Sequence, residues 1–342
     1  MPLTKAWTGG QYSLVRGVAC GSLAVALLWT GLRTPGFDTF SLVLAVFAGA
    51  VAIGLGPLHR TIAALLATLI SFGVDCLGGA AVQYVALWLS AHILLPKAPY
   101  GSLAAAGRRD PRSGWHMPAW YPIGCVATFF AARIVASVHA SMDHQDVLAW
   151  AFVFVATLVL FPKTALLGWT LSLTLGVALA AIGKGSASGA WFLHLLVFQP
   201  AWVPKKKEAG KDTVFYDGSC ALCHGCVRFL LAEDTEPASF RIAPIGGETW
   251  IARVPQSERM RAPDSIVLLR GGRVMVRSLA VIEILDSLSG LWWIVATVAR
   301  VVPRSMADRL YDTVASNRYR WFGRRSDACP LLPPDLVTRL EH

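Results

Sequence analysis

The chain has 342 residues, of which 55% are hydrophobic and only 15% are charged, and its mean hydropathy is +0.52. This composition argues against an ordinary soluble globule and predicts a membrane protein. The formal net charge of +10 does not predict nucleic-acid binding, because no basic stripe interleaved with aromatic residues is present. Much of the excess charge lies in short loops beside apolar segments, which is typical of membrane orientation and contact with anionic lipid.

Apolar segments of membrane-spanning length fill the first part of the chain. A helix needs about 20 mostly apolar residues to cross a bilayer. Seven stretches approach this length: 12–32, 37–55, 61–77, 80–95, 119–138, 147–161 and 164–182. An eighth stretch, 189–203, is short and contains His194, Gln199 and Pro200, so whether it crosses stays open. We therefore predict an α-helical polytopic membrane domain of seven or eight segments at residues 1–203.

The loops between these segments predict an orientation. With the N-terminus inside, the loop that carries Arg108, Arg109 and Arg112 falls inside, and the loop with Asp143 and Asp146 falls outside. An eighth crossing then places the remainder of the chain on the cytoplasmic side. The expected location is the cell inner membrane, with several passes through it, a cytoplasmic C-terminal domain and the lipid bilayer as a partner.

A charged linker at residues 204–212, which contains KKKEAGKD, separates this region from a second domain at residues 213–342. The second domain opens with a β-branched and aromatic run at 213–216, which predicts a short strand, and Asp217-Gly218 then turns the chain. Apolar side chains and cysteines recur at helical spacing from Cys223 to Leu231, and this spacing predicts a helix.

The rest of the second domain alternates strands and helices. Residues 240–244 predict a strand, and residues 265–269 and 274–276 flank Gly271-Gly272 as a hairpin. Three helices are then expected, at 278–290, 291–302 and 306–322. This order predicts a C-terminal α/β domain of thioredoxin-like plan.

The motif YDGSCALCHGC is compatible with three chemistries. Cys220 and Cys223 have the spacing of a thiol–disulfide site, and His224 after them completes the spacing of c-type haem attachment. Cys226 together with the distant Cys329 would complete a ligand set for an iron–sulfur cluster. A strand before the motif and a hairpin after it favour the redox interpretation, while the haem and iron–sulfur alternatives stay open. Under the redox interpretation we expect no cofactor and no metal.

In the redox interpretation, the motif supplies three catalytic candidates: Cys220, Cys223 and Asp217. Cys220 lies at the predicted helix N-terminus, where unpaired N–H groups favour a thiolate, so it is expected to attack. Cys223, within disulfide reach, is expected to be the more buried thiol and to resolve the mixed disulfide. Asp217, before the turn, either caps the helix or shuttles a proton to the thiols.

Several stretches of the second domain resemble the DCC family of thiol–disulfide oxidoreductases: YDGSCALCHGCVRFLLAED, FRIAPIGGETW, PDSIVLLRGGRVMVRSLAVIEIL, LYDTVASNRYRWFGRR and DACPLLP. The resemblance covers nearly all of residues 213–340 and implies that Asp217, Cys220 and Cys223 are the family's signature positions. It also implies exchange with protein or small-molecule thiols and disulfides. No proline directly precedes the strand at Ile266, where thioredoxins place a cis-proline facing the disulfide, so substrate docking is expected to differ.

The N-terminal region is similar, in GGQYSLVRGVACGSLAVALL and HLLVFQPAWVP, to multi-helix membrane domains of the DoxX and HTTM type. Together with the second domain, this similarity predicts a membrane-anchored thiol–disulfide oxidoreductase that exchanges dithiol and disulfide at its CxxC site. The alternative from another class is a membrane transport or lipid-binding protein whose DCC domain senses redox state.

Overall fold

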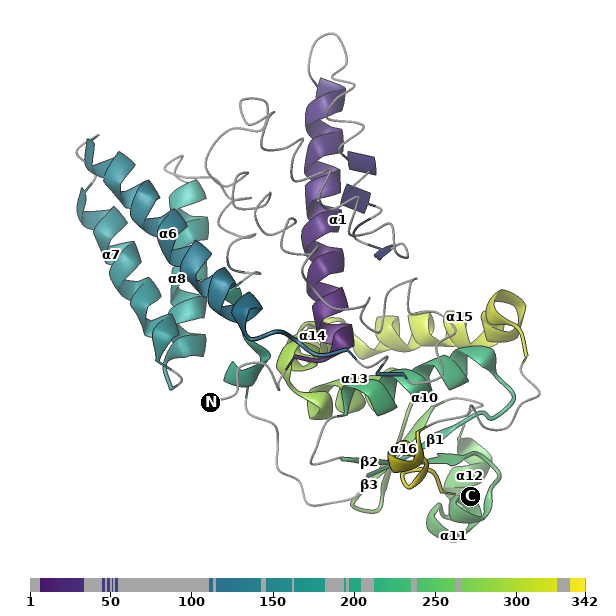
Figure 1. The fold of residues 1–342 in the computed structure, drawn as a ribbon. Helices are drawn as coiled ribbons and strands as arrows, with labels where there is room; N and C mark the ends of the chain where they lie inside the picture. The colour runs from purple at the N-terminus through teal and green to yellow at the C-terminus, as the bar shows by residue number, and fades with distance from the viewer. Residues whose placement is uncertain are drawn as a thin grey trace. The chain divides into compact units, whose positions relative to one another are not determined.

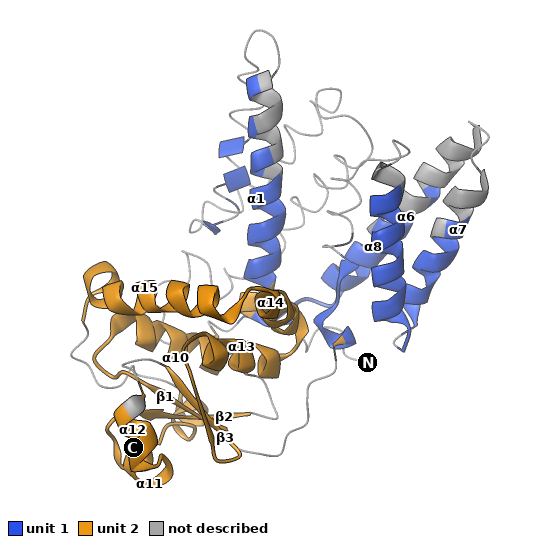
Figure 2. Ribbon diagram, turned by 180° about the vertical axis from the view of Figure 1, so that it is seen from behind, with its two compact units in different colours: residues 1–8, 12–106, 115–202 blue, residues 9–11, 107–114, 203–342 orange. Residues whose placement is uncertain are grey.

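The structure is a computed structural model, and its chain divides into two compact units (Figures 1 and 2). One unit holds residues 1–8, 12–106 and 115–202, and the other holds residues 9–11, 107–114 and 203–342. The described residues are 7–33, 45–46, 48–49, 51, 53–54, 111–112, 115–142, 146–161, 163–181, 194, 197–203, 212–234, 239–262, 266–324 and 333–341. The predicted domains at 1–203 and 213–342, with a linker at 204–212, stay a prediction.

The N-terminal part of the described chain is helical. Its helices are α1 (Gly9–Arg33), α6 (Trp120–Met142), α7 (Asp146–Thr157) and α8 (Ala165–Ala181), with short 3-10 turns at Leu158–Leu160 and Pro200–Trp202. Apolar packing joins α6 and α7: Phe129 of α6 lies in one buried cluster with Ala156 of α7 and with Val159. The hydroxyl of Thr164 donates to the Leu158 carbonyl at 3.0 Å and helps to close the turn that leads into α8.

None of the helices in the described part of the chain is both long enough and apolar enough to cross a membrane. The predicted α-helical polytopic membrane domain is therefore wrong, and so is the predicted multi-pass location in the cell inner membrane. The lipid-bilayer partner and the membrane-transport alternative lose their basis with it. The predicted spans 61–77 and 80–95, most of 37–55 and part of 189–203 lie outside the described residues.

Helix length and polar content give the physical reason for this correction. Helices α7 and α8 have 12 and 17 residues, which at about 1.5 Å per residue reach about 18 and 26 Å, short of a hydrocarbon core of about 30 Å. Helix α1 is longer, but it carries the polar residues Gln11, Ser13 and Arg16 in its first half. The mean hydropathy of a sequence segment reports how apolar the segment is, but it does not report where a helix ends.

The C-terminal part is built on a four-stranded mixed sheet with the order β2-β1-β3-β4. The strands are β1 (Asp212–Tyr216), β2 (Phe240–Pro244), β3 (Val267–Arg270) and β4 (Arg273–Val276). Strand β1 pairs in parallel with β2 and antiparallel with β3, and β3 pairs antiparallel with β4. The tight turn between β3 and β4 requires positive φ, which Gly271 and Gly272 supply at 54° and 80°.

Helices cover both faces of this sheet (Figure 1). They are α10 (Ala221–Glu233), α11 (Glu248–Arg253), α12 (Gln256–Arg261), α13 (Arg277–Leu288), α14 (Gly290–Val301), α15 (Arg304–Phe322) and α16 (Pro334–Val337). Alternate strand residues face opposite sides: Val214 packs in the cluster with α10 and α13, whereas Phe215 packs in the cluster that contains Trp250 of α11. A small mixed sheet between helices is consistent with the thioredoxin-like plan expected for this region.

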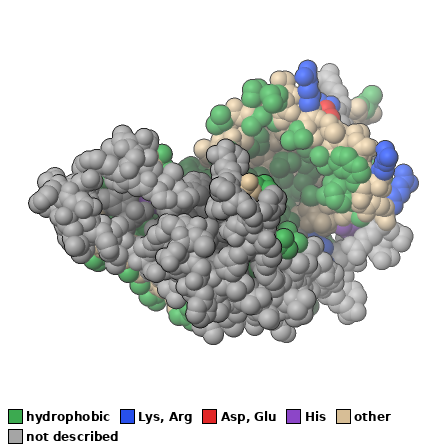
Figure 3. Space-filling view, turned by 90° about the horizontal axis from the view of Figure 1, so that it is seen from above, with side chains coloured by type: hydrophobic (Ala, Val, Ile, Leu, Met, Phe, Trp, Pro, Cys, Tyr) green, Lys and Arg blue, Asp and Glu red, His purple; other side chains and the backbone are tan. Residues whose placement is uncertain are grey.

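Hydrophobic side chains also reach the surface of the described chain, and Figure 3 shows them in groups with Lys and Arg beside them. On α14 and α15, the exposed examples include Val298, Val301, Met306 and Leu310. Apolar residues of this chain therefore lie on the surface as well as in the core. For this reason, the overall composition is a weak guide to where in the cell a protein resides.

Candidate functional site

The candidate site forms where β1 ends and α10 begins. After Tyr216, the side chain of Asp217 accepts a hydrogen bond from the Ser219 N–H at 2.9 Å, which shapes the turn. Cys220 is the N-cap of α10, with extended backbone, and its Sγ accepts the N–H of Cys223 at 3.2 Å. A sulfur in this position receives an N–H from the first turn of the helix.

His224 stabilises this turn through a hydrogen bond to its backbone. Its side chain is buried, with 1% of the residue exposed, and its Nε2–H donates to the Gly218 carbonyl at 2.8 Å. The imidazole also contacts the ring of Tyr216 edge to face. Because its Nε2 already holds the turn, this arrangement disfavours His224 as the ligand that the haem alternative needs.

The two motif cysteines differ in exposure, in the opposite sense to the prediction. Cys220 is 0% exposed, whereas Cys223 is partly exposed. The chain after α15 runs alongside Cys220: Cys220 forms a β-bridge with Arg324, and the Ala221 N–H donates to the Gly323 carbonyl at 3.4 Å. The expectation that Cys223 is the more buried thiol was wrong, because this covering segment comes from a hundred residues further along the chain.

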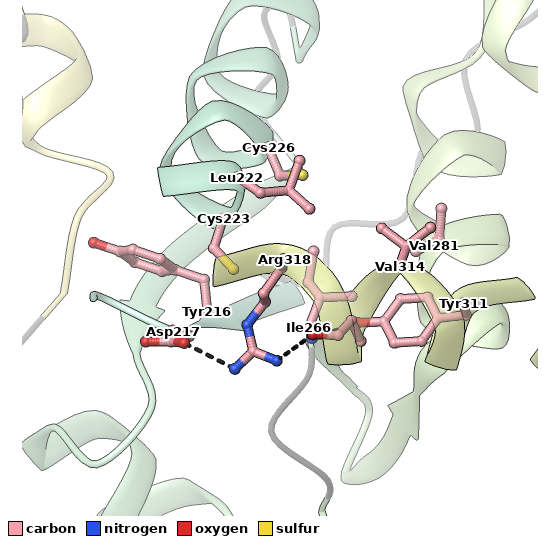
Figure 4. A pocket seen from close by; sticks show the side chains of 11 residues that line it. Tyr216, Asp217, Leu222, Cys223, Cys226, Ile266, Val281, Tyr311, Val314 and Arg318 are labelled. Carbon is pink, nitrogen blue, oxygen red and sulfur yellow. Dashed lines mark hydrogen bonds and ion pairs between the residues drawn. The ribbon is translucent and has the colours of Figure 1, made fainter. Parts of the chain in front are cut away.

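Asp217 is the centre of a polar cluster supplied by α15 (Figure 4). Its Oδ1 accepts the N–H and the hydroxyl of Ser219, and its Oδ2 accepts the Tyr319 hydroxyl and the Arg318 Nη2, the last at 3.1 Å. Arg318 and Arg324 each place a guanidinium over the ring of Tyr319, at 4.4 and 4.7 Å from its centroid. Sequence reasoning missed Arg318 and Tyr319, although both lie in the stretch LYDTVASNRYRWFGRR.

These contacts decide the charge of Asp217. Burial alone raises its pKa, but the hydrogen bonds from Tyr319, Ser219 and Arg318 outweigh burial and lower the pKa to about 2. Asp217 is therefore ionised wherever thiols titrate, which disfavours the proton-shuttle role. The helix cap is Cys220 rather than Asp217, so the other predicted role is also not what the geometry shows.

Cys223 has the opposite electrostatic character. Partial burial raises its pKa above the usual thiol value, and its hydrogen bond with Cys220, the neighbouring thiols and the charge of Asp217 raise it further. Cys223 is thus held as a neutral thiol.

A metal ion is a poorer fit to these residues than dithiol chemistry. One ligand atom each from Asp217, Cys220 and Cys223 lie within 4.8 Å of one another, and a carboxylate with two thiolates suits zinc. However, both oxygens of Asp217 already accept hydrogen bonds, so a metal would have to displace those donors. An iron–sulfur cluster would also require Cys329, which lies outside the described residues.

Two cysteines three residues apart, placed at a helix N-terminus after the first strand of a small mixed sheet, are the features of a thioredoxin-like thiol–disulfide domain. Comparison with known families agrees: residues 214–324 match the DCC1-like thiol-disulfide oxidoreductases. An uncharacterised protein of Bacillus subtilis (strain 168), YuxK, is 30% identical over 130 residues, which cover 37% of this chain and 90% of YuxK. The DCC family protein At1g52590, chloroplastic, of Arabidopsis thaliana is 34% identical over 128 residues, which cover 36% of this chain and 72% of that protein.

The chain therefore belongs to the DCC family of thiol–disulfide oxidoreductases. This membership supports a thiol–disulfide redox role, with thiols or disulfides as substrates. It gives no support to membrane anchoring or to the similarity of the N-terminal region to DoxX and HTTM domains. No solved structure matches the chain.

Proposed function

We propose that the C-terminal domain exchanges dithiol for disulfide at Cys220 and Cys223, with Asp217 as a charged group beside the two thiols. The observation that carries this proposal is the asymmetry of the pair. One sulfur is buried and hydrogen-bonded to the helix N-terminus, and the other is partly exposed. In such a pair, the partly exposed cysteine can be attacked by the substrate thiolate, and the buried cysteine can act as the leaving group.

In the oxidised site, an incoming thiolate attacks the accessible Sγ of Cys223. The bond between the two motif sulfurs breaks, and Cys220 leaves as a thiolate that keeps the hydrogen bond from the Cys223 N–H. This N–H is directed at the sulfur on which negative charge develops as the bond breaks. A second substrate thiol then attacks the substrate sulfur of the mixed disulfide, which releases a substrate disulfide and leaves Cys223 as a thiol.

Asp217 acts here through its fixed negative charge. The charge contributes to the raised pKa of Cys223, which favours its thiol form. Arg318 and Tyr319 are positioning residues, because they hold Asp217 in its ionised form through the hydrogen bonds described above. The two sulfurs and this polar cluster therefore lie together at the start of α10.

Single-cysteine variants test the proposed roles. We expect Cys220→Ser, in the full chain, to form a stable mixed disulfide with a small aromatic disulfide reagent at Cys223. Cys223→Ser should form far less adduct at Cys220, because that sulfur is covered. Mass spectrometry of peptides assigns the modified residue in each variant. Rapid adduct formation at Cys220 in Cys223→Ser would contradict the assignment and restore Cys220 as the attacking thiol.

A further inference from the structure

A cavity of about 250 Å³ lies beside Cys223, bounded by α10, α13 and α15 (Figure 4). Its wall is almost entirely apolar, with Leu222 from α10, Val281 from α13 and Val314 from α15 among the lining residues. Figure 4 shows the sulfur of Cys223 turned toward Arg318, at the polar end of this space. The exposed thiol of the pair therefore faces an apolar chamber.

Two polar contacts lie in the wall of the cavity. Arg318 forms an ion pair with Asp217 at 3.1 Å, and the hydroxyl of Tyr311 accepts the N–H of Ile266 at 3.0 Å. The side chain of Ile266, just before β3, also lines the cavity. The rest of the wall is mainly apolar, so a bound water would find few of the two to four partners that it needs. The cavity is therefore suited to an apolar occupant.

The size of the cavity indicates what kind of apolar group it takes. An apolar cavity of about 150 Å³ in a protein core binds benzene. A volume of about 250 Å³ therefore has room for one aromatic ring with a short aliphatic arm, or for a branched aliphatic chain of similar volume. A folded segment of a protein substrate would not enter a space of this size.

We propose that the cavity binds the apolar group of a small aliphatic or aromatic thiol and directs its sulfur to Cys223. This inference rests on the exchange proposed above and names its substrate class. The thiolate forms a bond to the Sγ of Cys223 while the disulfide to Cys220 breaks, and a second thiol then releases the substrate disulfide. In total, two thiols lose two electrons and two protons, and the protein disulfide gains them as two thiols.

Two thiols of similar acidity and different polarity test the assignment with the oxidised full-length protein. We expect phenylmethanethiol to reduce the site about 10- to 100-fold faster than 2-mercaptoethanol, the discrimination that burial of an apolar group in a pocket provides. Val314→Phe fills the cavity and should remove this preference. Thr313→Phe adds the same ring at an exposed position of the same helix and should keep it. Ala315→Leu is a smaller filling substitution, to be used if Val314→Phe does not fold.

A second measurement does not depend on exchange. Toluene, which cannot react with sulfur, should slow the alkylation of Cys223 by iodoacetamide in the reduced wild-type protein and have no effect in Val314→Phe. Equal rates with both thiols and no protection by toluene would overturn the substrate assignment while leaving the exchange reaction intact. Failure of the oxidised site to react with either thiol would overturn the exchange reaction and, with it, the substrate assignment.

Discussion

Cysteines in the two units of this protein are placed in very different surroundings. Cys20 on α1 and Cys125 on α6 are buried in the N-terminal unit, and burial raises the pKa of each to about 12. In the C-terminal unit, Cys220 receives a helix N–H, and Cys223 opens onto a cavity beside an ion pair. Burial away from a helix N-terminus disfavours the thiolate of Cys20 and Cys125, whereas the sulfur of Cys220 accepts an N–H at the start of a helix.

A buried arginine in each unit likewise differs from the other in its surroundings. Arg16 is 1% exposed, and burial lowers its pKa even though the nearby Tyr12 acts in the opposite direction. Arg318 is similarly buried, but its guanidinium meets the carboxylate of Asp217. A buried cation with a carboxylate partner becomes part of a charge cluster that can influence neighbouring thiols, which is the arrangement found next to the CxxC motif.

The largest expected effect comes from removing either motif thiol. Cys220→Ser and Cys223→Ser should each abolish multiple-turnover exchange between a small thiol and a disulfide, because neither variant can form the internal disulfide. The measurement is turnover by the purified full chain, with native folding checked by circular dichroism. Turnover at the wild-type rate in either variant would show that the reaction proceeds elsewhere in the protein.

Breaking the ion pair next to the thiols should have the next largest effect. Arg318→Leu leaves the ionised Asp217 in a largely buried position without its cation, and removing one partner of a buried pair costs about 3 kcal/mol of unfolding free energy. Urea unfolding measures this loss. The double variant Asp217→Leu, Arg318→Leu should recover part of it, since no charge is then left alone. A double variant that is less stable than Arg318→Leu would contradict this explanation.

A smaller effect is expected on the titration of Cys223. The charge of Asp217 raises the pKa of Cys223, so Asp217→Asn should lower that pKa and move the alkylation profile of Cys223 toward lower pH. Arg318, left with its positive charge, acts in the same direction. A shift of half to one unit would raise the rate at pH 8 about 3- to 10-fold. Tyr319→Phe, which keeps the charge of Asp217, should shift the profile less, and an unchanged profile in Asp217→Asn would refute the electrostatic role.

The smallest effect is expected in the N-terminal unit. Cys20→Ser and Cys125→Ala should leave turnover at Cys220 and Cys223 unchanged, because their thiols are buried and lie outside the CxxC motif. Alkylation of the folded wild-type protein should likewise modify Cys223 well before Cys20 or Cys125. Loss of turnover in either variant, with folding intact, would give these cysteines a redox role and remove the contrast between the two units.

Local patterns in the sequence were enough to place the elements that carry the motif. The strand predicted at 240–244 is found at Phe240–Pro244, and the turn at Gly271-Gly272 joins β3 to β4. These features depend on residues within a few positions of one another, through side-chain alternation and the φ angles that glycine allows. The N-terminal prediction failed because apolar composition alone does not determine where helices end or what they pack against.

Only the tertiary structure decided how the site is completed. Arg318 and Tyr319 reach Asp217 from 101 and 102 residues away, and Arg324 bridges to Cys220, so that Cys223 is the accessible thiol of the pair. The cavity likewise needs walls from three helices and from Ile266. A sulfur's exposure and a carboxylate's pKa depend on every group packed against them, and such contacts between distant segments are determined by the packing of helices on the sheet. The sequence alone therefore indicated which residues could react, while the fold determined which of the two cysteines is the more exposed.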